Sequence, residues 1–229
     1  MRTHILIPPA ALLSRHTRIA ALLRRARVVV CDFDGTLVDS NPIKFRAFEV
    51  CFAEFSERRA DIQAYCRHHH HVPRGEKFRF VYERILGVPY TAEVDTRLHA
   101  RFAEATTLQI IEAPEIPGAE RFLRTIAHSH LTAVLSSTPH ALLSEIVTAR
   151  GWRDCIHLLQ GAPVDKTRWL SQLRDARCLA RGELLVFGDT AADADAARSA
   201  HGVFIGVGSD AATLPGDEAI RDFTEVLSE

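Results

Sequence analysis

The hydrophobic pattern in the second half of the chain predicts a parallel α/β sheet. Short apolar runs that indicate strands occur at 27–31, 131–137, 155–160, 183–190 and 202–207. Apolar residues at helical spacing lie before and between the later strands, at 119–128, 139–150, 165–179 and 191–200. Strands that alternate with helices favour parallel pairing, because each crossover helix packs on the sheet. We therefore predict a doubly wound, Rossmann-like sheet, with a basic amphipathic helix at 10–26 before its first strand.

The segment between the first two strands has a different pattern. Helical spacing without a convincing strand covers about 41–112, with helices expected at 41–60, 75–86 and 91–110. A histidine-rich loop, His68 to His71, separates the first two helices. We expect an α/β core domain formed by 1–40 and 115–229, interrupted by an inserted α-helical domain at 41–114.

Composition and charge narrow the class of protein. The chain has 229 residues, of which 47% are apolar, enough for one large domain or a main domain with a smaller insert. The formal net charge is −1, and acidic and basic residues are mixed along the chain. This balance favours neither a nucleic-acid partner nor an anionic membrane.

The apolar runs and the cysteines indicate where the protein resides. No apolar run approaches the ~20 residues that a membrane span needs, and the N-terminal runs are flanked by arginines without a cleavage signal. The five cysteines are scattered and form no CxxC motif, which indicates reduced thiols. We therefore expect a cytoplasmic protein, either a monomer or a homodimer, with no membrane partner.

The stretch VVVCDFDGTLVDS places two aspartates at the end of a buried-looking strand. Asp32 and Asp34 are separated by a single residue, and two carboxylates this close repel each other. A divalent cation is the simplest partner that would stabilise the pair, since hard cations take oxygen ligands.

Polar side chains also follow the later strands. Ser136 and Ser137 end the second strand, Asp189 ends the fourth with Asp193 one turn later, and Lys166 opens the helix after the third. In open parallel sheets, ligands bind at the carboxyl ends of the strands, so we expect these groups to share one edge. A single strand-end aspartate is as often a helix cap, but the combination indicates a binding site.

The motifs DFDGTLVD, LSST and GDTAADADAA, together with Lys166, resemble the four sequence motifs of the haloacid dehalogenase superfamily of phosphotransferases. The resemblance covers the whole α/β core. The helical insert after the first motif is similar to the cap domain of the phosphoglycolate phosphatase and phosphoglucomutase-like branch.

The resemblance implies a catalytic role for each motif. Asp32 would be the nucleophile that attacks phosphorus and forms an aspartyl-phosphate. Asp34 would be the general acid for the leaving oxygen and then the general base for water. Ser136 and Lys166 would bind the phosphate oxygens, and Lys166 would also keep Asp32 ionised.

The resemblance also implies a Mg²⁺ ion. The side chains of Asp32 and Asp189 and the backbone carbonyl of Asp34 would hold it, and Asp193 would complete or support the site. Hard oxygen ligands of this kind are those that magnesium takes. Asp195 adds a further carboxylate nearby, but we expect it on a solvated helix face.

Four further residues are candidates for substrate binding. Gly35 would let the loop turn sharply beneath the phosphate, and Ser137 stands where relatives often have Asn or Gly. Arg74 and Lys77 lie at a helix start in the insert, where cations oppose the helix dipole and an anionic ligand would offset them. The alternative for Arg74 and Lys77 is that both are solvated surface charges.

Other residues of the insert are weaker candidates. Lys44 and Arg46 follow the first motif closely enough to face a substrate. For His68 to His71, a solvated loop is favoured over a metal site, because four consecutive histidines cannot all face one ion. We expect the phenylalanines to form the core of the insert, namely Phe45, Phe48, Phe52, Phe78 and Phe80.

Asp34 narrows the expected reaction. The dehalogenase and phosphonate-cleaving branches of the superfamily typically lack a carboxylic acid at that position, so its presence favours cleavage of a C–O–P link. We expect a Mg²⁺-dependent phosphomonoester hydrolase, acting on a small phosphorylated metabolite such as a sugar phosphate or a phosphorylated hydroxy-acid. An intramolecular sugar phosphomutase has the same motifs and is an alternative. A non-catalytic module that binds a phosphorylated metabolite is a third.

Overall fold

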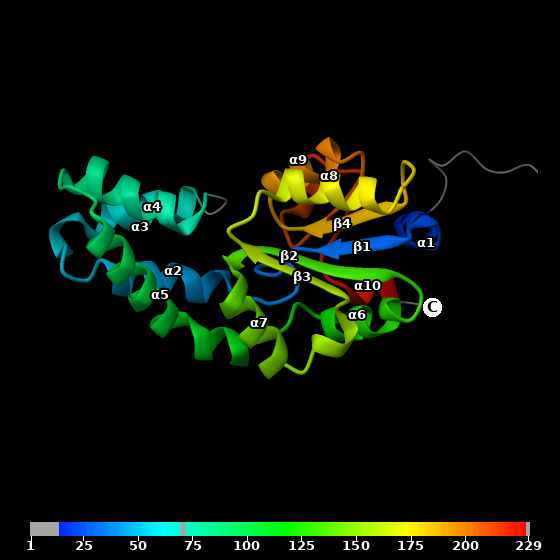
Figure 1. Cartoon of the computed structure of the whole chain (residues 1–229), viewed down its shortest axis with the longest axis horizontal. Coiled ribbons are helices and arrows are strands. Elements are labelled where there is room, and N and C mark those ends of the chain that lie inside the picture. Colours follow the sequence, from blue (N-terminus) through cyan, green and yellow to red (C-terminus); the bar gives the residue numbers. More distant parts are fainter. Residues whose placement is uncertain (1–13, 70–71, 228–229) are drawn as a thin grey trace, which may run out of the picture.

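The computed structural model describes residues 14–69 and 72–227 (Figure 1). Six strands form one sheet in the order β3-β2-β1-β4-β5-β6, and every neighbouring pair is parallel. The strands are β1 Val28–Cys31, β2 Leu131–Pro139, β3 Leu158–Ala162, β4 Leu184–Gly188, β5 Val203–Val207 and β6 Glu218–Ile220. The predicted α/β class with a doubly wound sheet is confirmed. The short edge strand β6 was not expected, because its three residues form no apolar run.

Helices cover both faces of this sheet. In Figure 1, α8 and α9 lie on one face, and α6, α7 and α10 lie on the other. The helices are α1 Arg15–Arg25, α6 Ala119–Ala127, α7 His140–Ala149, α8 Lys166–Ala176, α9 Ala191–Ser199 and α10 Thr224–Leu227. The expected helix at 10–26 corresponds to α1, and the first part of that expected range lies outside the described residues. None of the described helices is both long and apolar enough to cross a bilayer.

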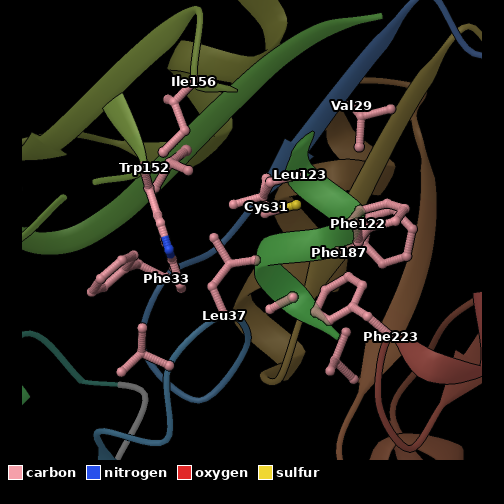
Figure 2. Close-up of a cluster of buried hydrophobic side chains, with 14 of the residues drawn as sticks. Val29, Cys31, Phe33, Leu37, Phe122, Leu123, Trp152, Ile156, Phe187 and Phe223 are labelled. Atoms are coloured by element: carbon pink, nitrogen blue, oxygen red, sulfur yellow. The ribbon is translucent and has the colours of Figure 1, made fainter. Parts of the chain in front are cut away.

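The core forms because alternate residues of each central strand point to opposite faces. Val29 and Cys31 pack against the side of α6 and α7, whereas Val28 and Val30 pack against α8 and α9. On the α6 side, aromatic rings fill the layer between sheet and helices (Figure 2). Three of these rings, from Phe122, Phe187 and Phe223, contact one another at centroid distances of 4.7–5.5 Å.

A helical insert between β1 and β2 forms a second body beside the sheet (Figure 1). Its helices are α2 Asn41–Cys51, α3 Arg59–His68, α4 Arg74–Phe80, a π-helical turn Val81–Leu86 and α5 Ala92–Glu112. The helical insert is confirmed, but the single helix expected at 41–60 is wrong. That helix ends at Cys51 and the chain turns before α3 begins at Arg59.

The insert has a core of its own, built from aromatic and aliphatic side chains. Phe48, Phe52 and Phe78 are buried in this core, as expected. Phe80 is not, because it is 40% exposed and stacks on Tyr65 at a centroid distance of 4.1 Å. Phe45 is half-buried and faces the cavity described below.

Candidate active site

The carboxyl ends of β1 and β4 bring three carboxylates together. The strand order reverses between these two strands, and such a switch point is where open α/β sheets bind ligands. Asp32 follows β1, Asp189 follows β4, and Asp193 lies in the first turn of α9. One oxygen of each lies within 4.8 Å of the others. The predicted gathering of these aspartates at one edge is therefore present.

Lys166 lies across from two of these aspartates. It is the first residue of α8, and the side chain of Asp165 caps that helix by accepting a hydrogen bond from the Arg168 amide at 3.0 Å. The Lys166 ammonium donates to Asp32 Oδ1 at 2.6 Å and to Asp193 Oδ1 at 2.7 Å. One lysine is thus shared between two buried carboxylates.

The charge balance at this edge leaves negative charge in excess. Burial raises the pKa of Asp32 to about 8, and although Lys166 lowers it, the neighbouring aspartates raise it further. Burial, together with Asp193, also raises the pKa of Asp189 to about 6. Burial lowers the pKa of Lys166, but Asp32 and Asp193 outweigh that effect and raise it above its ordinary value. Lys166 acts on Asp32 in the expected direction, because it lowers the pKa of that carboxyl, and its role in keeping Asp32 ionised beside a bound metal stays a prediction.

This donor set fits a Mg²⁺ ion, in agreement with the predicted cofactor. The oxygens of Asp32, Asp189 and Asp193 are hard ligands in the arrangement that a divalent cation takes. A cation bound there would offset the negative charge of the carboxylates that Lys166 leaves uncompensated. The side chain of Asp34 does not belong to this group, so a contribution from its backbone carbonyl stays a prediction.

Gly35 permits the close approach of the first motif to Asp189. Its φ is +82°, and a Cβ at this position would lie 2.2 Å from Asp189 Oδ2 and 2.3 Å from Asn41 Nδ2. Only glycine avoids both the left-handed strain and the collision. The sharp turn expected at Gly35 is present, and its immediate reason is the carboxylate of Asp189.

Gly35→Ala is expected to lower the free energy of unfolding by more than the 1–2 kcal/mol that a left-handed residue costs, and to weaken Mg²⁺ binding. The added methyl group must displace Asp189. Urea unfolding and a magnesium titration followed by thermal shift measure the two effects.

Gly87→Ala is the matched control, because Gly87 has a φ of +69° and a methyl group added there would meet nothing within 4 Å. In this variant the free energy of unfolding should fall only by the cost of the left-handed backbone, and the affinity for Mg²⁺ should be unchanged. Equal losses in the two variants, with magnesium binding intact in both, would contradict a role of Gly35 in placing Asp189.

The side chain of Asp34 bonds hydroxyl groups and a lysine. It accepts hydrogen bonds from Ser40 at 2.7 Å, Thr138 at 2.8 Å and Ser136 at 3.1 Å, and it pairs with Lys44 at 2.6 Å. Burial raises the pKa of Asp34, but Lys44 and the hydroxyl groups outweigh burial and hold it below its ordinary value. In this conformation these contacts favour the ionised form of Asp34, and its acid and base roles stay predictions.

The hydroxyl groups at the end of β2 do not all have the same environment. Ser136 is fully buried and donates to Asp34, so a contact between Ser136 and phosphate stays a prediction. Ser137 is exposed and Thr138 is buried, and both line the cavity.

Sequence reasoning did not assign Thr138 or Asn41 to the site. Thr138 had a usable signal, because alternation along a strand places it on the same side as Ser136. Asn41 had none beyond its position at a helix start, yet its side chain donates to Asp189 Oδ2 at 3.2 Å.

A cavity of about 350 Å³ lies between this edge and the helical insert. Asp32, Asp34, Lys166, Asp189 and Asp193 line it from the sheet side. Lys44, Phe45, Phe48, Arg74, Lys77 and Phe102 line it from the insert.

Two other candidates from the insert do not reach this cavity. Arg46 is exposed and borders a separate depression near Glu49 and Arg59. His68 is exposed and His69 packs on Tyr65, while the other two histidines of the run lie outside the described residues.

The fold is shared with solved structures of low sequence identity. A predicted phosphoglycolate phosphatase from Haemophilus somnus 129pt is 19% identical, with a TM-score of 0.68 over 89% of this chain and 97% of that one. A Thermotoga maritima protein described as a β-phosphoglucomutase is 16% identical, with a TM-score of 0.64 over 88% and 97%. The HAD hydrolase YfnB from Bacillus subtilis, solved with bound magnesium, is 13% identical, with a TM-score of 0.66 over 88% and 97%.

Sequence comparison identifies the family. No curated protein matches the chain. The family model of the haloacid dehalogenase-like hydrolases matches residues 26–201, which include β1, the helical insert and α9. Its match covers most of the chain and all four motifs, so the chain belongs to the haloacid dehalogenase-like hydrolases.

Proposed function

We propose that this hydrolase is a Mg²⁺-dependent phosphatase that cleaves the phosphate ester of a small metabolite through an aspartyl-phosphate on Asp32. One observation supports this most strongly. Asp32, Asp189 and Asp193 have carboxylate oxygens within 4.8 Å of one another, Lys166 bonds two of them, and all four residues line the same cavity.

The first step transfers the phosphoryl group to the protein. An Asp32 carboxylate oxygen attacks phosphorus, and the bond between phosphorus and the ester oxygen breaks. The leaving oxygen takes a proton from Asp34 and departs as an alcohol. In the second step a water oxygen attacks the phosphorus of the aspartyl-phosphate while Asp34 takes its proton, which releases inorganic phosphate and restores Asp32.

The surrounding residues stabilise charge and set protonation. When bound between Asp32, Asp189 and Asp193, Mg²⁺ supplies positive charge to the phosphoryl oxygens. Lys166 holds Asp32 through its hydrogen bond and adds a second positive charge. Thr36 and Asn41 donate to the two oxygens of Asp189 and fix its orientation.

Asp34 must change partners during this cycle. Its hydrogen bonds and its ion pair with Lys44 favour the ionised form, which is the form needed to activate water. The acid form is favoured when the carboxyl separates from Lys44, which belongs to α2 of the helical insert. Movement of the insert would therefore change the protonation of Asp34.

The similarity to the phosphoglycolate phosphatase, to the β-phosphoglucomutase and to the magnesium-bound YfnB agrees with this proposal. It does not separate a hydrolase from a mutase, since both reactions begin with the same transfer to aspartate. We favour the hydrolase because the family model that matches the chain is that of hydrolases, and the product of the assay below separates the two reactions.

We expect release of inorganic phosphate from at least one member of a panel of phosphomonoesters, and only in the presence of magnesium. The panel should contain sugar phosphates, phosphorylated hydroxy-acids and 4-nitrophenyl phosphate. Adding EDTA should abolish release and excess magnesium should restore it.

Two outcomes would contradict the proposal. A panel without metal-dependent release, despite saturable binding of a phosphate ester, would indicate a binding module. An isomerised product that requires a bisphosphate activator would indicate a mutase.

A further inference from the structure

The wall of the cavity contributed by the helical insert is cationic. Among the described residues that line the cavity, every carboxylate comes from the sheet edge, at Asp32, Asp34, Asp189 and Asp193. The insert contributes Lys44, Arg74 and Lys77 but no acidic residue. The cavity therefore has a negative end that suits a metal ion and a positive end opposite it.

Arg74 and Lys77 face this cavity from a common surface. They are three residues apart on α4, which places them on one face of the helix. The Arg74 guanidinium lies 4.5 Å from the centroid of the Phe102 ring, and the Lys77 ammonium lies 4.9 Å from that of Phe48. The two rings contact each other at a centroid distance of 5.0 Å, so both cations rest on one aromatic platform.

Both cations are held in a partly dehydrated position. Lys77 is only 5% exposed, and burial lowers its pKa to about 8. Burial also lowers the pKa of Arg74. In the part of the chain that the structure describes, Arg74 forms no ion pair. A partly buried guanidinium that faces a cavity is stabilised by an anion entering that cavity.

Lys44 also lines this cavity but contacts residues of the sheet edge. Its ammonium pairs with Asp34 at 2.6 Å and donates to Thr138 at 3.3 Å. It is therefore held at the sheet edge, and a distal group in the cavity would meet Arg74 and Lys77 on the wall formed by the insert.

We propose that the substrate carries a second anionic group, a carboxylate or a second phosphate, and that Arg74 and Lys77 bind it while the transferred phosphate lies at Asp32. This inference rests on the proposed phosphatase function. The carbon skeleton between the two anions is short, since a cavity of about 350 Å³ lies near the lower end of the range for ligand sites.

Matched pairs of phosphate esters test this directly. In each pair one member has the second anion and the other replaces it with a neutral group: 3-phosphoglycerate against glycerol 3-phosphate, and glucose 1,6-bisphosphate against glucose 1-phosphate. The carboxylate pair and the bisphosphate pair distinguish the two possible anions. For at least one pair, kcat/KM should be higher for the anionic member by roughly 30-fold. This factor corresponds to the smallest loss expected when one partner of a buried charge pair is removed.

Substitution of the cations should reduce this preference. In Arg74→Gln and Lys77→Gln, kcat/KM for the anionic member should fall roughly 30-fold more than for its neutral partner. Arg74→Lys should recover part of the preference, because it restores charge without the planar fork. If the two cations had only a structural role, their substitution would lower kcat/KM equally for both members of a pair. The ratio of the two kcat/KM values is therefore the decisive readout.

Arg79→Gln is the matched control. Arg79 lies on the same helix but is exposed, with its guanidinium 5.6 Å from the centroid of the Tyr90 ring, outside the cavity. The Arg79→Gln variant should prefer the anionic member of each pair as strongly as the unmodified protein does.

Magnesium-dependent hydrolysis with equal rates for both members of each pair would overturn the inference and leave the phosphatase proposal standing. An unchanged preference in both Arg74→Gln and Lys77→Gln would also overturn it. Absence of metal-dependent hydrolysis for every ester would instead overturn the proposed function on which the inference rests.

Discussion

Asp32→Asn is expected to lower kcat for phosphate release by at least about 10⁴-fold, because the amide cannot act as the nucleophile. The substitution keeps the size of the side chain, and Lys166 retains its hydrogen bond to Asp193. Fold should therefore persist, which circular dichroism and thermal unfolding can verify. Phosphate release in saturating magnesium is the measurement.

Asp195→Asn is the matched control for this substitution. Asp195 lies two residues beyond Asp193 on α9, but its side chain is exposed and pairs with Arg198 at 3.0 Å. The variant should retain full turnover. An Asp32→Asn protein with more than about one hundredth of the original kcat would refute the nucleophile assignment, since loss of a nucleophile costs far more than this.

Asp34→Asn is expected to lower kcat by about 10²–10⁴-fold while leaving the affinity for Mg²⁺ nearly unchanged. The acid and base functions are lost, but the side chain of Asp34 does not belong to the group formed by Asp32, Asp189 and Asp193. Phosphate release measures the first effect, and a magnesium titration by calorimetry measures the second.

A substrate with a good leaving group separates the two roles of Asp34. With 4-nitrophenyl phosphate, whose leaving group departs without a proton, Asp34→Asn should release about one equivalent of 4-nitrophenolate per enzyme and then stall, because the intermediate lacks its base. A variant that binds magnesium much more weakly, or that shows undiminished steady turnover, would contradict the assignment.

Much of the sheet and the metal site could be predicted from the sequence alone. The buried run at 28–31 and the run at 184–188 are apolar over their whole length, which is typical of strands covered on both faces. Parallel order then sends their carboxyl ends to one edge. The proximity of Asp32 and Asp189 follows from that order, because each lies directly after its strand.

The tertiary structure decided the elements with weak local patterns. The strand β6 has three residues and becomes a strand only by pairing with β5. The break between α2 and α3 occurs inside a stretch of continuous helical spacing, at Phe52, which is buried in the core of the insert. Tertiary packing commonly overrides such local preferences.

The sequence by itself determined the fold class, the inserted helices and the identities of the groups at the sheet edge, since these follow from hydrophobic periodicity and strand order. Only the tertiary structure decided how those groups share charge. Lys166 donates hydrogen bonds to both Asp32 and Asp193, and Lys44 forms an ion pair with Asp34. Hydrogen bonds between residues more than 100 positions apart, such as that from Ser136 to Asp34, depend on side-chain directions set by packing. Burial and these partners together then set the pKa of each carboxyl group, and no local pattern in the sequence encodes that combination.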